Sequence, residues 1–340
     1  MTLGNTEAQV RGWASVIRAA AATALVGAAA LAPASAQSVP TIRVGWTVPA
    51  EEAKWLIMKR PELFPDYGKK YQVEWFQFQG TPPMSQALLA KAVECATQAP
   101  ISFAKAVGEG GLQGYILGSL AQEKKGFFAV LWAVKDESPI KTIADLKGRT
   151  VATTVFGGGI HALMMVLLER NGIDPEKDVT MREVGFPLVE DALRSGRVEA
   201  GPFAQPFWAR AKEKGGLRVL FDLSDVQSPL TETFEACRKD FVDTNPDAIG
   251  AYMADFKRAT KYAIAHPEEA RKVTSEVTKI DLPTLEKYLM TEHDFYRDPT
   301  GTPDFAAIQK TWDLFYDKKL IAQRLAVTDY QRLDLTPKPD

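Results

Sequence analysis

From Thr41 onward, short apolar segments with strand character alternate with amphipathic segments of helical spacing, and no other feature constrains the fold as strongly. Residues 42–46 and 71–78 predict strands, and residues 51–60 and 84–93 predict the helices that follow them. Strands that alternate with helices of about 10 to 15 residues are typical of parallel sheets covered by crossover helices. We therefore expect an α/β fold.

The alternation divides into two units. The second unit is predicted over residues 133–232, where strands around 150–153, 179–184, 198–203 and 219–221 enclose helices at 162–171 and 188–195. The first unit combines residues 37–132 with residues 233–340, whose last part is mostly helical, at 246–266, 267–278, 283–290 and 302–318. We expect two α/β lobes, joined by crossing strands near 127–134 and 224–235.

Residues 1–36 have the features of a secretory signal peptide. Arg11 and Arg18 give a positive leading segment, residues 19–32 are apolar, and an Ala-x-Ala site ends at Ala36. The apolar stretch is shorter than the roughly 20 residues that span a bilayer. We expect cleavage after Ala36 and a periplasmic protein, with a retained anchor helix as the alternative.

The composition argues against several classes of function. The 340 residues carry a net charge of −2, so no basic balance indicates a nucleic-acid partner. The three histidines and two cysteines show no spacing typical of metal ligands, so no metal site is expected. Cys95 and Cys237 could form a disulfide, but two cysteines make no disulfide framework, and separate buried thiols are favoured.

A glycine-rich segment, Phe156-Gly157-Gly158-Gly159-Ile160-His161, follows a predicted strand and opens a predicted helix. Backbone N–H groups and the positive helix end favour an anion at such a position. The alternative is a tight turn that binds nothing. The segment lacks the Lys-Ser/Thr ending of a nucleotide-binding loop and the acidic partner of a dinucleotide fold, so no cofactor is expected.

Other candidate ligand contacts lie at predicted strand ends, which face the ligand crevice in open α/β sheets. Gly80 and Thr81 form a second strand-to-helix turn, where Thr81 could contact a ligand or only cap the helix. The aromatic candidates could equally be core residues. The predicted ligand-facing residues are Trp46, Gly80, Thr81, Gln98, Phe156, Gly157, Gly158, Gly159, Ile160, His161, Phe186 and Gln205.

No catalytic arrangement is present in the sequence. The nucleophile-elbow pattern Gly-x-Ser-x-Gly is missing. The carboxylate pairs Glu51-Glu52 and Glu268-Glu269 fall on predicted helices and are expected to face solvent. An enzyme is therefore disfavoured.

Several segments resemble, in their order and spacing, the periplasmic binding proteins of the nitrate/sulfonate/taurine class of ABC importers. Residues 136–148 are similar to that family's "DSPIKS…ADLKGKKV" segment, 80–83 to its Gly/Ser-rich turn, 97–100 to its "TG-x-x-P" turn, and 194–200 to its "GxVDA" segment. The resemblance covers about residues 41–320. It implies a type II-like periplasmic binding protein fold with a hinge, a central ligand cleft and no cofactor. The implied partners are a small-molecule ligand, an ABC permease and its ATPase, and the implied state is a monomer.

Two departures from the family pattern bear on the ligand. Sulfonate-binding members carry Lys-Gly-Ser-x-x-His where this chain has residues 156–161, so Phe156 replaces Lys and Gly158 replaces the hydroxyl donor. Members also carry Trp-Asp/Glu-Pro where this chain has Ala204-Gln205-Pro206, which removes a partner for a ligand amine. Both changes favour a larger, more apolar acid, an aromatic or branched sulfonate or carboxylate.

Three rival interpretations remain at this stage. The first is an enzyme related to pyrimidine-precursor synthases, which would need a denser set of cysteines and histidines. The second is a receptor that reports to a sensor or chemotaxis partner. The third is a pocket for a neutral heterocycle. Capture of an anion by hinge closure is the favoured mechanism.

Overall fold

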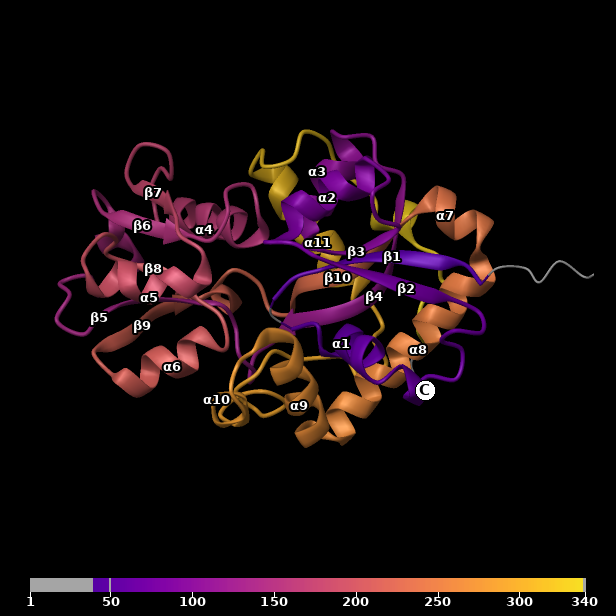
Figure 1. Cartoon of the computed structure of the whole chain (residues 1–340). Helices are drawn as coiled ribbons and strands as arrows, with labels where there is room; N and C mark the ends of the chain where they lie inside the picture. The colour runs from indigo at the N-terminus through magenta and orange to yellow at the C-terminus, as the bar shows by residue number, and fades with distance from the viewer. Residues whose placement is uncertain (1–38, 49, 339–340) are drawn as a thin grey trace, which may run out of the picture. The chain divides into compact units, whose positions relative to one another are not determined.

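The computed structural model describes residues 39–48 and 50–338, and its strands and helices alternate as the sequence predicts (Figure 1). The predicted signal peptide lies outside the described residues. The strands are β1 (Thr41–Trp46), β2 (Gln72–Gln77), β3 (Cys95–Gln98), β4 (Gly114–Glu123), β5 (Leu131–Lys135), β6 (Thr150–Thr153), β7 (Thr180–Glu183), β8 (Gly201–Phe203), β9 (Leu217–Asp222) and β10 (Leu230–Arg238).

The helices lie in the connections and in the C-terminal third. They are α1 (Glu52–Lys59), α2 (Thr81–Leu89), α3 (Pro100–Gly108), α4 (Gly159–Arg170), α5 (Phe186–Arg194), α6 (Phe207–Lys214), α7 (Lys239–Thr244), α8 (Pro246–Ala265), α9 (Pro267–Thr278), α10 (Leu282–Glu286) and α11 (Phe305–Asp317). Short 3₁₀ helices cover Pro61–Leu63, Ile143–Leu146, Leu223–Asp225 and Val327–Tyr330. No helix of the described residues is long and apolar enough to cross a membrane.

The strands form separate sheets. A five-stranded sheet has the order β2-β1-β3-β10-β4, a three-stranded sheet has the order β8-β5-β9, and β6 pairs with β7. Val151 of β6 also bridges to Ala200, next to β8. The chain leaves the five-stranded sheet after β4 and returns to it at β10, so residues 124–130 and 223–229 connect one sheet to the other.

The expectation of purely parallel sheets is wrong. β1 runs parallel to β2 and β3, and β6 runs parallel to β7. However, β10 is antiparallel to β3 and β4, and β5 is antiparallel to β8 and β9. β4 carries the chain out of the five-stranded sheet and β10 carries it back, so these neighbouring strands run in opposite directions. The sequence analysis missed β4, because this strand is buried along its whole length and shows no apolar–polar alternation.

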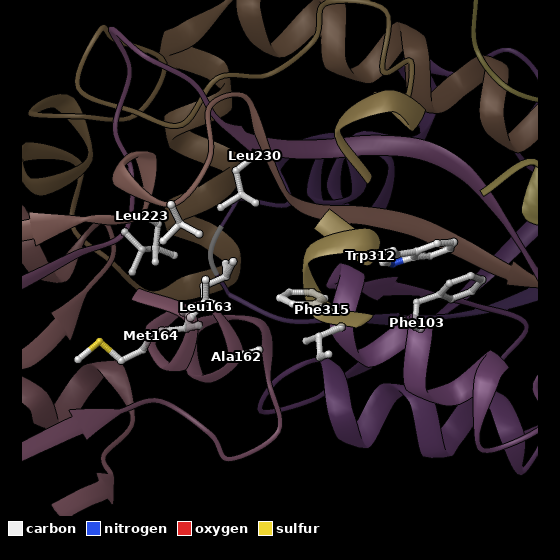
Figure 2. Close-up of a cluster of buried hydrophobic side chains, with 14 of the residues drawn as sticks. Phe103, Ala162, Leu163, Met164, Leu223, Leu230, Trp312 and Phe315 are labelled. Carbon is white, nitrogen blue, oxygen red and sulfur yellow. The ribbon is translucent and has the colours of Figure 1, made fainter. Parts of the chain in front are cut away.

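Helices cover both faces of the five-stranded sheet (Figure 1), and a cluster of buried apolar side chains lies on each face. On the side of α1 and α8, the buried aromatic residues include Trp55, Tyr252 and Phe256. On the side of α3 and α11, Phe103 and Trp312 stack with ring centroids 6.3 Å apart. Figure 2 shows that this second cluster extends past Phe315 to Leu163 of α4. The packing therefore fixes the start of α4, where the glycine-rich segment lies.

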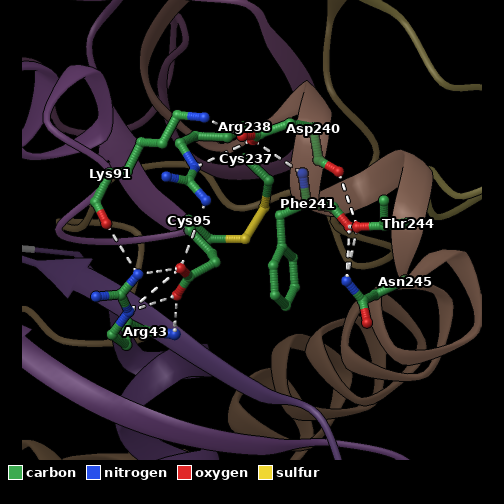
Figure 3. Close-up of polar contacts among 10 residues, drawn as sticks. Arg43, Lys91, Cys95, Cys237, Arg238, Asp240, Phe241, Thr244 and Asn245 are labelled. Carbon is green, nitrogen blue, oxygen red and sulfur yellow. Dashed lines mark hydrogen bonds and ion pairs between the residues drawn. A yellow bond between two sulfur atoms is a disulfide. The ribbon is translucent and has the colours of Figure 1, made fainter.

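Cys95 of β3 and Cys237 of β10 form a disulfide (Figure 3). The expectation of separate buried thiols is wrong. The two residues lie directly opposite each other on antiparallel neighbouring strands, with Cα atoms 4.0 Å apart. This register depends on β10 returning to the sheet beside β3, and the spacing of the cysteines in the sequence does not reveal it.

Glu51 and Glu52 are buried, so the expectation that this pair faces solvent is also wrong. The Lys54 ammonium lies 3.3 Å from the Glu51 carboxylate and 2.6 Å from that of Glu235. The Arg297 guanidinium lies 2.8 Å from the carboxylates of both Glu52 and Asp294. Each buried pair of acids therefore shares one cation, which is the usual condition for burying carboxylates. Glu268 is exposed, as expected.

Candidate functional site

A cavity of about 200 Å³ lies where the ends of several strands meet the starts of several helices. Its lining comes from the loops after β1, β2 and β6, from the start of β10, and from residues near α5 and α6. The lining residues are Thr47, Val48, Ala50, Gln77, Phe78, Gln79, Gly80, Thr81, Ala99, Thr154, Val155, Gly158, Gly159, Ile160, Gly185, Phe186, Pro187, Phe207, Glu232, Thr233 and Phe295.

Three helices begin at this cavity. The first residues of α2, α4 and α5 line it together with the glycine that precedes each helix, Gly80, Gly158 and Gly185. None of these glycines provides a side-chain cap, so the first N–H groups of each helix have no capping side chain. The positive ends of three helix dipoles therefore meet at one cavity, which favours a negatively charged ligand.

The three helix starts do not offer equal numbers of donors. Pro82 and Pro83 in α2 and Pro187 in α5 have no N–H group. In α4, Gly159 and Ile160 occupy the first two positions, and both line the cavity. The start of α4 is therefore the strongest donor site for an anion.

Glycine is required at position 158 because the loop is tight. A Cβ atom added to Gly158 would lie 2.8 Å from Cγ1 of Val155, closer than real side chains approach. The adjacent Gly157 has φ of +79°, a conformation that other residues rarely adopt. The predicted role of the glycines in freeing the backbone therefore has a direct steric basis.

Gly80, Thr81, Gly158, Gly159, Ile160 and Phe186, all named by the sequence analysis, line the cavity. Phe156, Gly157 and His161 lie in or beside the same loop but not among the lining residues. The N–H of Phe156 donates to the Glu183 carboxylate at 2.8 Å, and the N–H of Gly157 donates to Nδ1 of His161 at 3.3 Å. Burial lowers the pKa of His161, consistent with a neutral ring whose Nδ1 accepts this bond. These groups therefore hold the loop together.

Trp46 and Gln98 are buried behind the cavity. The ring of Trp46 packs edge-to-face on Trp55, with centroids 6.1 Å apart. The Gln98 side chain is 0% exposed, and its Oε1 accepts a hydrogen bond from Oγ of Ser85 at 2.6 Å. Both residues support the wall of the cavity without lining it.

Gln205 lies at a second, wider cleft, beside Trp208 and Lys212. Its amide Nε2 donates to the carbonyl of His293 at 3.1 Å, and its Oε1 accepts from the N–H of Ala209 at 3.2 Å. Both ends of this side chain are therefore engaged within the protein.

Aromatic side chains give the cavity its apolar surface. Phe186 and Phe207 stack with ring centroids 6.0 Å apart and an interplanar angle of 11°. Phe78 and Phe295 add further apolar wall. Such surfaces suit the carbon skeleton of an organic ligand, while the helix starts suit its acidic group.

One charged lining residue escaped the sequence analysis. Glu232 lies at an irregularity of β10, between residues 231 and 233, where the pairing with β4 shifts register. Burial raises its pKa to about 7. In the sequence, Glu232 differs from its neighbours only as an acidic residue inside a strand, a position where acidic residues are uncommon. This signal is too weak to assign a role to the residue.

Among residues 39–48 and 50–338, one group has atoms close enough to bind a metal ion, Cys95, Glu235 and Cys237. Both sulfur atoms are joined in the disulfide and are not thiolate ligands. This group therefore does not form a metal centre.

A sequence model described as the NMT1-like family matches residues 35–278. Among curated proteins, an aliphatic sulfonates-binding protein of Escherichia coli (strain K12) is 24% identical over 305 residues, which cover 89% of this chain and 92% of that protein. A second protein of that description, from Bacillus subtilis (strain 168), is 23% identical over 280 residues, which cover 81% of each chain.

Solved structures share the fold. The periplasmic aliphatic sulphonate binding protein of Escherichia coli aligns with a TM-score of 0.70 and 23% identity, covering 88% of this chain and 92% of that chain. The periplasmic nitrate-binding protein of Synechocystis PCC 6803 aligns with a TM-score of 0.69 and 17% identity, covering 87% of each chain. The fold is therefore that of the periplasmic binding proteins, as the sequence analysis expected.

Proposed function

Because this chain belongs to the NMT1-like family, we propose that it is the solute-binding component of an ABC importer and that it captures a small organic anion, a sulfonate or a carboxylate. The relatives named above are described as binding proteins, which agrees with a binding protein rather than an enzyme. The ligands in their descriptions, aliphatic sulfonates and nitrate, are anions.

The observation that carries this proposal is the meeting of three uncapped helix starts at one cavity. The N–H groups of Gly159 and Ile160 would bind the acidic group, since no side chain caps them. The stacked rings of Phe186 and Phe207 would contact the carbon skeleton. An aryl or branched acid fits both features.

The mechanism proposed for capture is hinge closure. Residues 37–132 with 233–340 would form one lobe and residues 133–232 the other, and the cavity is lined by residues of both segments. A ligand that contacts both lobes binds the closed form better and shifts the population toward it. In this proposal the signal peptide is cleaved after Ala36, and the protein is a monomer in the periplasm. The permease would then recognise its closed form.

The proposal is tested with a substitution that removes one backbone donor. In Ile160→Pro the N–H at the second helical position is lost, while α2 shows that prolines are accommodated at the start of a helix in this protein. The control Ile160→Ala also loses the apolar side chain but keeps the N–H. Residues 37–340 are titrated by calorimetry with aryl and alkyl sulfonates and carboxylates.

We expect an acid from this panel to bind and Ile160→Pro to bind it about tenfold more weakly than Ile160→Ala, as for a lost hydrogen bond to a charged group. Equal affinities of the two variants would show that the start of α4 does not hold the anion. Binding of neutral heterocycles alone would contradict the anion proposal.

A further inference from the structure

One member of an acidic pair with no basic partner lines the cavity. Glu232 lines the cavity, and Glu123, at the end of the neighbouring strand β4, is 0% exposed. No described residue donates a hydrogen bond to either carboxyl oxygen of Glu123 in suitable geometry. No Lys, Arg or His of the described residues forms an ion pair with Glu123 or Glu232.

The two carboxyl groups interact with each other. Burial raises the pKa of both groups, and the charge of Glu232 raises that of Glu123 further. With a pKa of about 7, Glu232, which lines the cavity, carries a negative charge above neutral pH.

This arrangement differs from the other buried acids. Lys54 lies between Glu51 and Glu235, and Arg297 lies between Glu52 and Asp294. A partly buried charge without a partner is unfavourable, so a cation beside Glu232 would stabilise its charged form. The open space beside Glu232 is the cavity itself.

We propose that Glu232, the charged residue of the cavity lining, binds a positively charged nitrogen of the ligand. The ligand is then a zwitterion whose acidic group lies at the start of α4 and whose ammonium or protonated ring nitrogen lies at Glu232. This inference rests on the proposed function and adds the second charged group of the ligand. It replaces the expectation, drawn from Gln205, that a ligand amine is disfavoured.

Matched pairs of ligands separate this inference from the proposed function. In each pair an ammonium group replaces a methyl group of the same size, as in 4-(aminomethyl)benzenesulfonate against 4-ethylbenzenesulfonate and 3-aminopropanesulfonate against butanesulfonate. A carboxylate pair, 4-(aminomethyl)benzoate against 4-ethylbenzoate, extends the set. Dissociation constants are measured by calorimetry at pH 8, above the pKa of Glu232 and below that of the amines.

The ammonium member is expected to bind at least about tenfold more tightly, the range for a charge-assisted hydrogen bond. Glu232→Gln should remove this preference, while Glu268→Gln, an exposed acid on α9, should keep it. Glu123→Gln should also keep it, because Glu232 and not Glu123 lines the cavity. This second variant tests the pair without changing the cavity carboxylate.

Each outcome bears on one of the two statements. Equal binding of both members of every pair overturns the cation subsite and leaves the anion site intact. A preference that survives in Glu232→Gln overturns the assignment to Glu232. If no member of any pair binds, the anion proposal is overturned, and this inference is overturned with it.

Discussion

The buried acids around Lys54 and Arg297 and the acidic pair at the cavity illustrate two different uses of a buried carboxylate. In the first group, each pair of acids has a cation between its members, as Glu51 and Glu235 have Lys54. In the second, no basic residue of the described chain forms an ion pair with Glu123 or Glu232. The acids with a cation are held inside the fold by ion pairs, whereas in the pair without one Glu232 lines the cavity. The contrast supports the inference that the second pair serves to bind a ligand.

The largest expected effect comes from removing the cation of the first group. Lys54→Met should lower the free energy of unfolding by about 3–5 kcal/mol, because two buried carboxylates lose their partner. Lys59→Met, in the same helix but exposed, is the control and should change it by less than about 0.5 kcal/mol. Urea unfolding monitored by circular dichroism measures both, and equal stability of the two variants would show that Lys54 does not stabilise the fold.

The disulfide should have the next largest effect. It joins β3 to β10 beside Glu235 and closes a loop with a sequence separation of 142 residues. The free energy of unfolding of the double variant Cys95→Ala/Cys237→Ala should be about 2–4 kcal/mol lower than that of the oxidised protein. A reducing agent should destabilise the original protein and leave the double variant unchanged. Identical urea midpoints with and without reductant would contradict a structural disulfide.

The smallest effect on stability is expected at the cavity, and it depends on pH. The pKa of Glu232 is about 7 in the folded protein, against about 4.3 in an unfolded chain. Between these two pH values the folded protein binds more protons at this residue than the unfolded chain does. The contribution of Glu232 to stability is therefore largest below about pH 4.3 and is lost as the pH rises through 7. The neighbouring acid Glu123 affects the titration of Glu232, and the charge of Asp222 in turn raises the pKa of Glu123.

Glu232→Gln should therefore flatten the dependence of stability on pH between 5 and 8. Part of the slope should remain, because burial also raises the pKa of Glu51 to about 7. Urea midpoints at pH 5, 6, 7 and 8 measure the slope in both proteins. Parallel curves would mean that Glu232 does not titrate in this range.

The sequence predicted the alternation of strands and helices, the return of the chain to the first sheet, and six of the residues that line the cavity. These features follow from local patterns, such as the three glycines before α4 and the prolines at the helix starts. The antiparallel register of β3 and β10, and with it the disulfide, depends on which strands become neighbours. Local pattern does not encode that choice.

The burial of charge was also beyond prediction from the sequence. Glu51 and Glu52 look like surface residues, and only the positions of Lys54 and of the distant Arg297 explain their burial. Glu232 had no distinguishing motif, because its role depends on a register shift in β10 and on Glu123 from another strand. Gln205 drew attention through a family pattern, yet its side chain is bonded within the protein.

The most direct test is a crystal structure of residues 37–340 with 4-(aminomethyl)benzenesulfonate. The account predicts sulfonate oxygens at about 2.9 Å from the N–H nitrogens of Gly159 and Ile160, and the ammonium at about 2.8 Å from the Glu232 carboxylate. A ligand bound outside the cavity, or one whose ammonium points to solvent and leaves Glu232 without a cation, would contradict it.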